Sequence, residues 1–469
     1  MNTKQIRQTI LDLAIRGELV PQDPSDEPAS VLLERIRAEK EQLIKDKKLK
    51  RDKKDNEPID EVPFELPEGW EWCRLGEIGI WGSGVTPSRN KKEYYDGNIP
   101  WLKTGDLNDS YIYETSELIS DLAVKEYSLK KIPIGSILIA MYGATIAKLG
   151  LLEIEVTTNQ ACCACTPFSG IVNKFLFHYL FSQKQNIKNK AEGGAQPNIS
   201  KEKLINFLFP LPPLAEQHRI VEKIEQLFAL VDTIETHKEQ LKALIKQAKN
   251  QVLSDAIAGK LIHQDPNDEP AEALLKRIGK TTATAADTPY EKLPKGWAWC
   301  RLGEVCEKIE TGNSVNSHVK EKKYKNLRTG YPYIGTKDIE ENNLINYENG
   351  VRIPLGENFK IAKKNSVLLC IEGGSAGRKI GITNRDVCFG NKLAKFYSHN
   401  INPFYILFFL MSEKFKIQFK ESISGLIGGV SVNKLGKFVI PLPPLQEQHR
   451  IVEKIENYFS FLDTIESNL

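Results

Sequence analysis

A glycine-rich segment near the C-terminus has the residue types of a phosphate-binding loop. It reads Gly373-Gly-Ser-Ala-Gly-Arg-Lys379. A loop that holds Mg²⁺ and a triphosphate ends in Gly-Lys-Ser or Gly-Lys-Thr, because the lysine contacts the phosphates and the hydroxyl contacts the metal. This segment lacks that ending, so we do not expect it to hydrolyse ATP. Its backbone N–H groups, with Arg378 or Lys379, could instead contact a DNA phosphate.

A second motif, Asn402-Pro403-Phe404-Tyr405, is similar to the Asn-Pro-Pro-Tyr motif with which adenine-N6 methyltransferases hold a flipped base. It lacks the second proline, no glycine-rich loop for S-adenosylmethionine precedes it, and the matching segment at Asn173 does not contain it. We interpret it as a helix start, with Asn402 as the cap and Pro403 in the first turn. Asp46-Lys-Lys48 has a nuclease-like spacing but lies in a charged helical run.

Cysteine and histidine spacings do not indicate a metal site. The chain has eight cysteines, and the densest cluster is Cys162, Cys163 and Cys165. No second cysteine pair and no histidine accompanies this cluster at the spacing of metal ligands. We expect reduced thiols in a buried strand of a cytoplasmic protein. His218 and His449 recur beside Glu-Gln pairs at matching helix starts, and we interpret them as capping and contact residues. The sequence thus predicts neither a cofactor nor catalytic residues.

The elements that position these residues occur twice. Residues 210–235 return as 441–466 with 20 of 26 positions identical, and residues 66–77 return as 293–304 with 10 of 12 identical. Residues 11–36 return as 253–278 with 16 of 26 identical. In the middle of the chain, the long helical stretch continues directly into residues 253–278. The second copy of that stretch stops at Leu469, and its continuation is found at residues 1–20, so the repeat is circularly permuted.

The stretch 210–258 contains the longest predicted helix, since it begins with an extended Pro-Leu-Pro-Pro lead-in and continues without Gly or Pro until Gly259. Its length is on the order of 65 Å. Apolar residues follow a heptad spacing that needs a partner helix; we call them the seam, and they are Ile220, Ile224, Leu227, Val231, Ile234, Leu241, Ile245, Ala248 and Val252.

The remaining pattern predicts a mixed α/β protein. Helices are expected at residues 4–17 and from Ser30 onward, strands at 136–142 and 160–166, and a helix at 175–190. The segments 100–106 and 332–338 resemble each other, as do 143–150 and 374–381, so the two variable regions share one fold. The predicted divisions are 1–65, 66–209, 210–292, 293–440 and 441–469.

Charge is unevenly distributed. Residues 78–209 contain 14 basic and 12 acidic residues, whereas residues 305–440 contain 21 basic and 12 acidic residues. The second region therefore has the balance of a surface that faces phosphate. The basic run 40–54 is interpreted as a solvated helix end and linker. No apolar run approaches the ~20 residues of a membrane span.

The motif Pro-Leu-Pro-Pro-Leu-x-Glu-Gln-x-Arg-Ile-Val, present twice, and the two Leu-Pro-x-Gly-Trp-x-Trp segments resemble the specificity (S) subunits of Type I restriction–modification systems. The resemblance covers essentially the full chain. It implies two α/β target recognition domains that read the halves of a split DNA sequence from the major groove. It also implies an antiparallel pair of long helices with pseudo-two-fold symmetry, which fixes the gap between half-sites. The implied partners are double-stranded DNA, two methyltransferase subunits and restriction/translocase subunits.

Residues that read different sequences should differ between the copies. Trp70, Trp72, Trp297 and Trp299 are identical, so we assign them to the core or an interface rather than to base stacking. Polar residues in diverged loops are the candidate DNA contacts. They are Arg89, Asn90, Lys91, Lys92, Lys103, Thr104, Gln196 and Asn198 in the first domain, and Asn313, Asn316, Lys320, Lys322, Lys323, Thr336, Lys337, Arg378, Lys379, Ser431 and Asn433 in the second.

Two functions from different classes fit these observations. The first is a non-catalytic DNA-reading subunit that targets methylation and cleavage by its partners. The second is a protein–protein scaffold with two divergent ligand-binding domains. The basic second domain and the repeated motifs favour the first.

Overall fold

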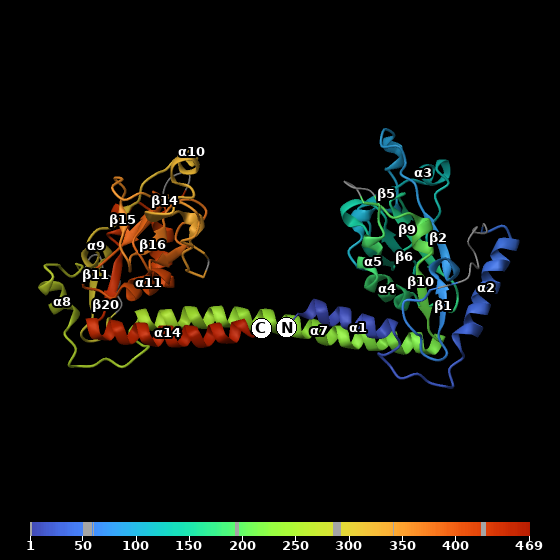
Figure 1. The fold of residues 1–469 in the computed structure, drawn as a ribbon, viewed down its shortest axis with the longest axis horizontal. Coiled ribbons are helices and arrows are strands. Elements are labelled where there is room, and N and C mark those ends of the chain that lie inside the picture. The colour runs from blue at the N-terminus through green and yellow to red at the C-terminus, as the bar shows by residue number, and fades with distance from the viewer. Residues whose placement is uncertain are drawn as a thin grey trace. The chain divides into compact units, whose positions relative to one another are not determined.

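The computed structural model describes residues 2–49, 59, 61–192, 197–284, 292–340, 342–423 and 428–469. Contacts divide the chain into two units, Met1–His237 and Lys238–Leu469 (Figure 1). The division falls within one long helix, α7 (Leu214–Ile257), so each unit contains one part of it. Both units are mixed α/β, as the sequence predicts.

The first unit contains two sheets. A five-stranded sheet has the order β2-β9-β6-β7-β4, and a three-stranded sheet has the order β5-β3-β8. The strands are β1 (Glu71–Arg74), β2 (Gly79–Ser83), β3 (Ile99–Leu102), β4 (Ser110–Ile112), β5 (Glu117–Ile119), β6 (Ile137–Ala140), β7 (Leu149–Leu152), β8 (Thr157–Thr158), β9 (Cys162–Pro167) and β10 (Leu208–Leu211). The helices are α1 (Thr3–Ile15), α2 (Ala29–Lys45), α3 (Asp121–Glu126), α4 (Asn173–Ser182), α5 (Lys184–Asn189) and α6 (Lys201–Ile205), with short turns η1 (Leu75–Glu77), η2 (Lys92–Tyr94), η3 (Thr104–Asp106) and η4 (Gly143–Thr145).

The second unit has two four-stranded sheets, β12-β19-β16-β17 and β14-β13-β18-β15. Its strands are β11 (Ala298–Arg301), β12 (Glu310–Thr311), β13 (Tyr331–Ile334), β14 (Arg352–Ile353), β15 (Ile361–Ala362), β16 (Val367–Cys370), β17 (Ile380–Ile382), β18 (Val387–Phe389), β19 (Leu393–Phe396) and β20 (Val439–Leu442). Its helices are α8 (Ala271–Arg277), α9 (Leu302–Val305), α10 (Ser317–Val319), α11 (Pro403–Met411), α12 (Glu413–Ser422), α13 (Val432–Leu435) and α14 (Leu445–Ser467), with short turns η5 (Lys320–Tyr324) and η6 (Thr336–Asp338).

The two repeated motifs meet as a strand pair in each unit. The Trp-x-Trp strand β1 pairs antiparallel with the proline-rich strand β10, with Trp72 opposite Pro210. The same pairing joins β11 and β20, with Trp299 opposite Pro441. The proline-rich lead-in is therefore extended, as predicted, and the long helix starts directly after it. Gly259, just past the end of α7, has a φ of +68°, the left-handed conformation typical of a helix stop.

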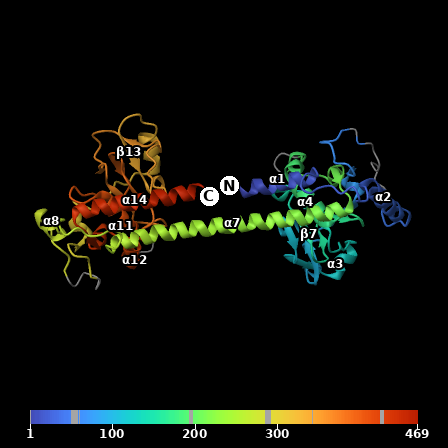
Figure 2. The same ribbon diagram turned by 90° about the horizontal axis from the view of Figure 1, so that it is seen from below.

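Helix α7 pairs antiparallel with a different helix in each unit. In the first unit, α1 lies along the N-terminal part of α7 (Figure 2), where Arg7 forms ion pairs with Asp232 and Glu235. In the second unit, α14 lies along the C-terminal part, where Lys249 pairs with Asp463 and Glu466. The permuted repeat therefore rebuilds the same helix pair twice.

The seam is covered only in part. Ile220, Ile224 and Ile245 are buried, as the heptad spacing predicts, but Ile234 and Leu241 are 39% and 37% exposed. The apolar face of α7 is therefore less well covered at these two residues than toward the two ends of the helix.

All eight cysteines are buried. Cys162, Cys163 and Cys165 lie in the buried strand β9, as predicted for this cluster. Burial raises the pKa of the Cys163 and Cys306 thiols to about 12, so both remain protonated at neutral pH. Within the described ranges, no three His, Cys, Asp or Glu side chains gather closely enough to hold a metal ion. Nor does any described helix have the length and apolarity needed to span a membrane.

Candidate nucleic-acid interface

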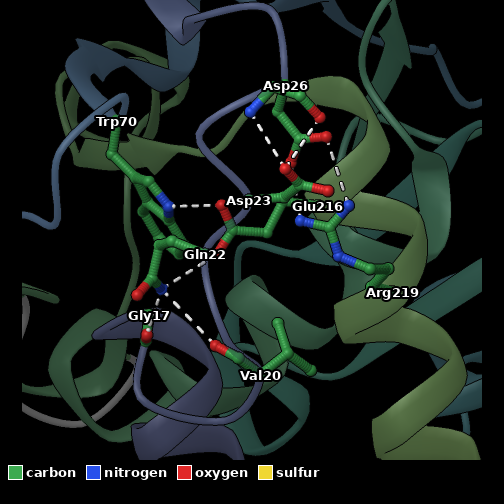
Figure 3. Close-up of polar contacts among 9 residues, drawn as sticks. Gly17, Val20, Gln22, Asp23, Asp26, Trp70, Glu216 and Arg219 are labelled. Carbon is green, nitrogen blue, oxygen red and sulfur yellow. Dashed lines mark hydrogen bonds and ion pairs between the residues drawn. The ribbon is translucent and has the colours of Figure 1, made fainter.

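A partly buried polar cluster fixes the first repeated loop against the start of α7 (Figure 3). Glu216 accepts hydrogen bonds from the indole of Trp70 at 2.9 Å and from the amide of Gln22 at 3.1 Å. Arg219 donates to both carboxylate oxygens of Asp26, at 3.2 and 2.6 Å. We call Gln22, Asp26, Trp70, Glu216 and Arg219 the anchoring cluster of the first unit.

The second unit repeats the glutamine–glutamate and arginine–aspartate contacts of this cluster. Gln264 donates to Glu447 at 3.2 Å, and Arg450 donates to both oxygens of Asp268, at 3.3 and 2.5 Å. Trp297 is buried beside it. Burial raises the pKa of Glu447, as it does that of Glu216 in the first unit. The repeated Glu-Gln-x-Arg motif thus has an architectural role in both units.

The glutamine of this motif links the long helix to the domain above it. Gln217 accepts a hydrogen bond from the backbone N–H of Val172 at 2.8 Å, and Gln448 accepts one from the N–H of Asn402 at 3.0 Å. Asn402 also accepts from the N–H of Phe404 at 3.0 Å, with Pro403 in the first turn of α11. The interpretation of this motif as a capped helix start is confirmed. His218 and His449 are exposed, and His449 contacts the Asn402 amide at 2.9 Å.

The four tryptophans of the repeated Trp-x-Trp segments pack against other side chains rather than pointing into solvent. Trp70 and Trp297 are buried, which confirms the assignment to the core. Trp72 is half-buried, with its ring 4.9 Å from that of Phe64. Trp299 is half-buried under Lys414, whose ammonium lies 4.6 Å from the ring centre.

In the first unit, three charged side chains from separate segments meet above the three-stranded sheet. Arg89 donates to Glu117 at 2.6 Å, and Lys103 donates to the other carboxylate oxygen at 2.5 Å. The guanidinium of Arg89 lies 4.4 Å from the ring centre of Tyr95 and 5.2 Å from that of Trp101. The two cations lower the pKa of Glu117, mainly through the hydrogen bond from Arg89.

The other candidates of this unit are spread more widely. Lys91 donates to the Tyr94 hydroxyl at 2.8 Å and pairs with Glu126 at 3.6 Å, whereas Asn90 and Lys92 are exposed and Thr104 is half-buried. Asn198 lies elsewhere, where its backbone pairs with Glu192 and Tyr142. Gln196 lies outside the described residues.

In the second unit, several candidate cations gather around β13. The ammonium of Lys320 lies 4.6 Å from the ring centre of Tyr333, and Lys379 donates to the carbonyl of Thr336 at 3.3 Å. Lys337 is exposed in the short turn η6 that follows this strand. Burial lowers the pKa of Lys320. Arg378, in the glycine-rich segment, donates to the carbonyl of Gly374.

Some candidates in the second unit already have internal partners. Asn313 accepts a hydrogen bond from the N–H of Lys360 at 2.8 Å, and Asn316 and Ser431 cap the helices α10 and α13. Lys323 pairs with Glu357 at 2.7 Å. Two further candidates, Lys322 and Asn433, are exposed. A DNA contact by Asn313, Asn316 or Ser431 therefore has to compete with a local structural role.

No sequence pattern distinguishes Glu117, Tyr95, Trp101 or Tyr333 as a site residue. Glu117 is separated from Arg89 by 28 positions, and the two meet only because β5 pairs with β3 and places Glu117 opposite Trp101. A correct strand pairing could have identified it. Composition alone could not, because a single glutamate on a surface strand has no distinguishing pattern.

Comparison with known proteins assigns the class. The family model described as "Type I restriction modification DNA specificity domain" matches twice, at residues 67–243 and 294–469. The chain therefore belongs to the family of Type I restriction–modification specificity subunits.

Among the curated relatives, it is similar to two Escherichia coli proteins. The Type I restriction enzyme EcoAI specificity subunit is 28% identical over 97% of this chain and 88% of the relative. The EcoEI specificity subunit is 28% identical over 99% and 90%. Among solved structures, the HsdS subunit from Thermoanaerobacter tengcongensis has a TM-score of 0.55 at 23% identity, covering 87% of this chain and 94% of that one. A chain from a structure of a Type I restriction–modification system reaches a TM-score of 0.61 at 22% identity with the same coverage. These likenesses show a shared fold.

Proposed function

We propose that this chain is the sequence-reading subunit of a DNA methylation and restriction complex. Residues 66–209 and 293–440 would each read one half of a bipartite target in double-stranded DNA. The helical segments outside these domains would dock two methyltransferase subunits and, through them, restriction subunits. The chain itself would carry out no catalysis.

The observation that carries this proposal is the contrast between the anchoring clusters and the surfaces above them. Gln22, Glu216 and Arg219 make the same contacts as Gln264, Glu447 and Arg450. The loops above them contain different polar residues in the two units. A frame that repeats while its displayed side chains differ is what two readers of different sequences require.

The charge of the second domain supports a phosphate-bearing ligand. Residues 305–440 contain nine more basic than acidic residues, and Lys322 and Lys337 are exposed there. Phosphate contacts by such side chains position a protein on DNA, whereas polar side chains that reach base edges determine specificity. We propose that some candidate residues of each domain contact phosphates and that others contact base edges.

The test is methylome sequencing of the host with and without the gene. We expect a split methylated motif that disappears on deletion and returns when the intact gene is restored. A methylation pattern unchanged by deletion would contradict the proposal and favour a scaffold that binds other ligands. The purified chain should transfer no methyl group from labelled S-adenosylmethionine unless its partner subunits are added.

A further inference from the structure

Trp101 and Tyr333 occupy equivalent positions in the two units. Trp101 lies on β3, which pairs parallel with β8, and Tyr333 lies on β13, which pairs parallel with β18. Each strand is followed by the same turn, in which an aspartate accepts a backbone hydrogen bond at 2.8 Å: Asp106 from Lys103, and Asp338 from Gly335. The two rings therefore occupy corresponding positions in the duplicated fold.

Each ring has a cation placed on it by a loop that differs between the copies. Arg89 lies 5.2 Å from the centre of the Trp101 ring, and Lys320 lies 4.6 Å from the centre of the Tyr333 ring. Arg89 follows a short proline-containing loop, whereas Lys320 begins the turn η5. Two different loop sequences thus place a positive charge at the same position of the duplicated fold.

The two positions differ in what stands opposite the ring. Glu117 is the cross-strand partner of Trp101 and holds both Arg89 and Lys103. In the second unit, Val351 occupies this place, with its carbonyl bonded to the N–H of Tyr333 at 3.0 Å. Among the described residues, a carboxylate therefore hydrogen-bonds the ring-bound cation in the first unit, whereas no such bond is seen for Lys320 in the second.

This arrangement suits the recognition of a base edge. The bond to Glu117 uses one of the five N–H donors of Arg89, so donors remain for a ligand. The rings of Tyr95 and Trp101 and the carboxylate together restrict the guanidinium before DNA arrives, which reduces the conformational entropy lost on binding. An arginine fork matches the O6 and N7 acceptors of guanine in the major groove.

This inference rests on the proposed function. We propose that the cation packed on the Trp101 ring of β3, and the cation packed on the Tyr333 ring of β13, each contact a base in the DNA. Arg89, oriented by Glu117, reads a guanine in one half-site. Glu117 is then a positioning residue. Lys320 is the equivalent reader in the second domain, with a single ammonium and no carboxylate opposite its ring.

The test uses the full chain assembled with the methyltransferase subunits of its own host, after the target motif has been read from the methylome. Binding is measured to duplexes that carry each single base-pair substitution in both half-sites. For R89Q, we expect discrimination at one G·C pair, roughly five- to 150-fold in the unmodified complex, to fall toward one. Discrimination elsewhere in that half-site, and throughout the other half-site, should not change.

K92Q is the matched control, because it removes the same charge from an exposed residue three positions along the chain, at the start of η2. It should change the affinity for all duplexes alike. E117Q should weaken discrimination at the same G·C pair as R89Q, and the double variant should lose no more than R89Q alone. If Glu117 had only a structural role, E117Q would not weaken discrimination at that base pair in particular.

R89Q that leaves every discrimination ratio unchanged, or a folded R89Q that loses affinity for all duplexes equally, would overturn the inference. If R89Q does not fold, R89K replaces it, and its discrimination at that G·C pair should fall because lysine lacks the fork that Glu117 orients. An unchanged ratio for R89K would then overturn the inference. Gene deletion separates the two proposals: methylation that survives deletion contradicts the function, whereas methylation that disappears while R89Q reads normally contradicts only the role of Arg89.

Discussion

Lys249 pairs with Asp463 at 2.5 Å in the second unit, at the same place in the repeat where Arg7 pairs with Asp232 in the first. Lys249 belongs to α7, whereas Arg7 belongs to the N-terminal helix α1. One continuous helix therefore supplies its N-terminal part to the first unit and its C-terminal part to the second. The circular permutation of the sequence repeat therefore corresponds to one helix that contributes to both units.

The ion pair between Arg219 and Asp26 should stabilise the first unit. Asp26 is 9% exposed at its side chain and accepts two hydrogen bonds from Arg219. We expect R219M to lower the free energy of unfolding by about 1–2 kcal/mol, because it leaves a desolvated carboxylate without its partner. The measurement is calorimetric unfolding. R35M is the control, since the Arg35–Glu27 pair is more than 40% exposed on both sides and should contribute below about 1 kcal/mol. Equal losses in the two variants would contradict a special role for the buried pair.

The buried carboxyl of Glu216 should make stability depend on pH. Burial raises its pKa above the ordinary value of 4.5, so the folded state binds a proton more tightly than the unfolded state. The free energy of unfolding should therefore fall as the pH rises from about 4.5 through the raised pKa, and then level off. E216Q should remove this contribution.

Unfolding of the wild type and E216Q across this pH range gives the comparison. The exposed Glu222, also on α7, provides the control substitution E222Q. A difference between the wild type and E216Q that grows toward low pH in favour of E216Q would contradict the assignment.

Exchange of one domain should change one half of the target. We expect replacement of residues 78–209 by the equivalent segment of a relative to alter one half-site and leave the other intact. The reason is that the anchoring cluster lies outside this segment, so the frame that holds the domain is retained. Methylome sequencing of the host that expresses the hybrid reads both halves at once. A change in both half-sites would show that the domains do not read independently.

Exposed lysines should contribute to DNA affinity in a salt-dependent way. We expect K92A and K322A each to lower the slope of log affinity against log salt by about 0.9, without changing the sequence preference. K91A and K323A should have smaller effects, because Lys91 already pairs with Glu126 and Lys323 with Glu357. The measurement is binding of the assembled complex over a range of salt concentrations. An unchanged slope for a K92A/K322A double variant would place these lysines away from the phosphates.

Much of the frame could be predicted from the sequence because its signals are local or repeated. The seam spacing and Gly259 predicted the long helix, and self-comparison revealed the permutation. The identity of Trp70 and Trp297 between diverged copies predicted their burial. The Asn402–Pro403 cap was also predictable, because a helix start depends on a few consecutive residues.

Only the tertiary structure decided which side chains meet. Glu117 joins Arg89 and Lys103 because two strands pair, and the ring of Trp101 receives a cation because a loop folds back over β3. Asn313 was a candidate reader by residue type, yet its side-chain amide oxygen accepts a hydrogen bond from the backbone N–H of Lys360. Likewise, the heptad spacing could not show that Ile234 and Leu241 are more than a third exposed, because spacing identifies an apolar face but not how fully that face is covered. Contacts between residues distant in sequence depend on strand pairing and chain reversal, and these are set by the packing of the whole domain.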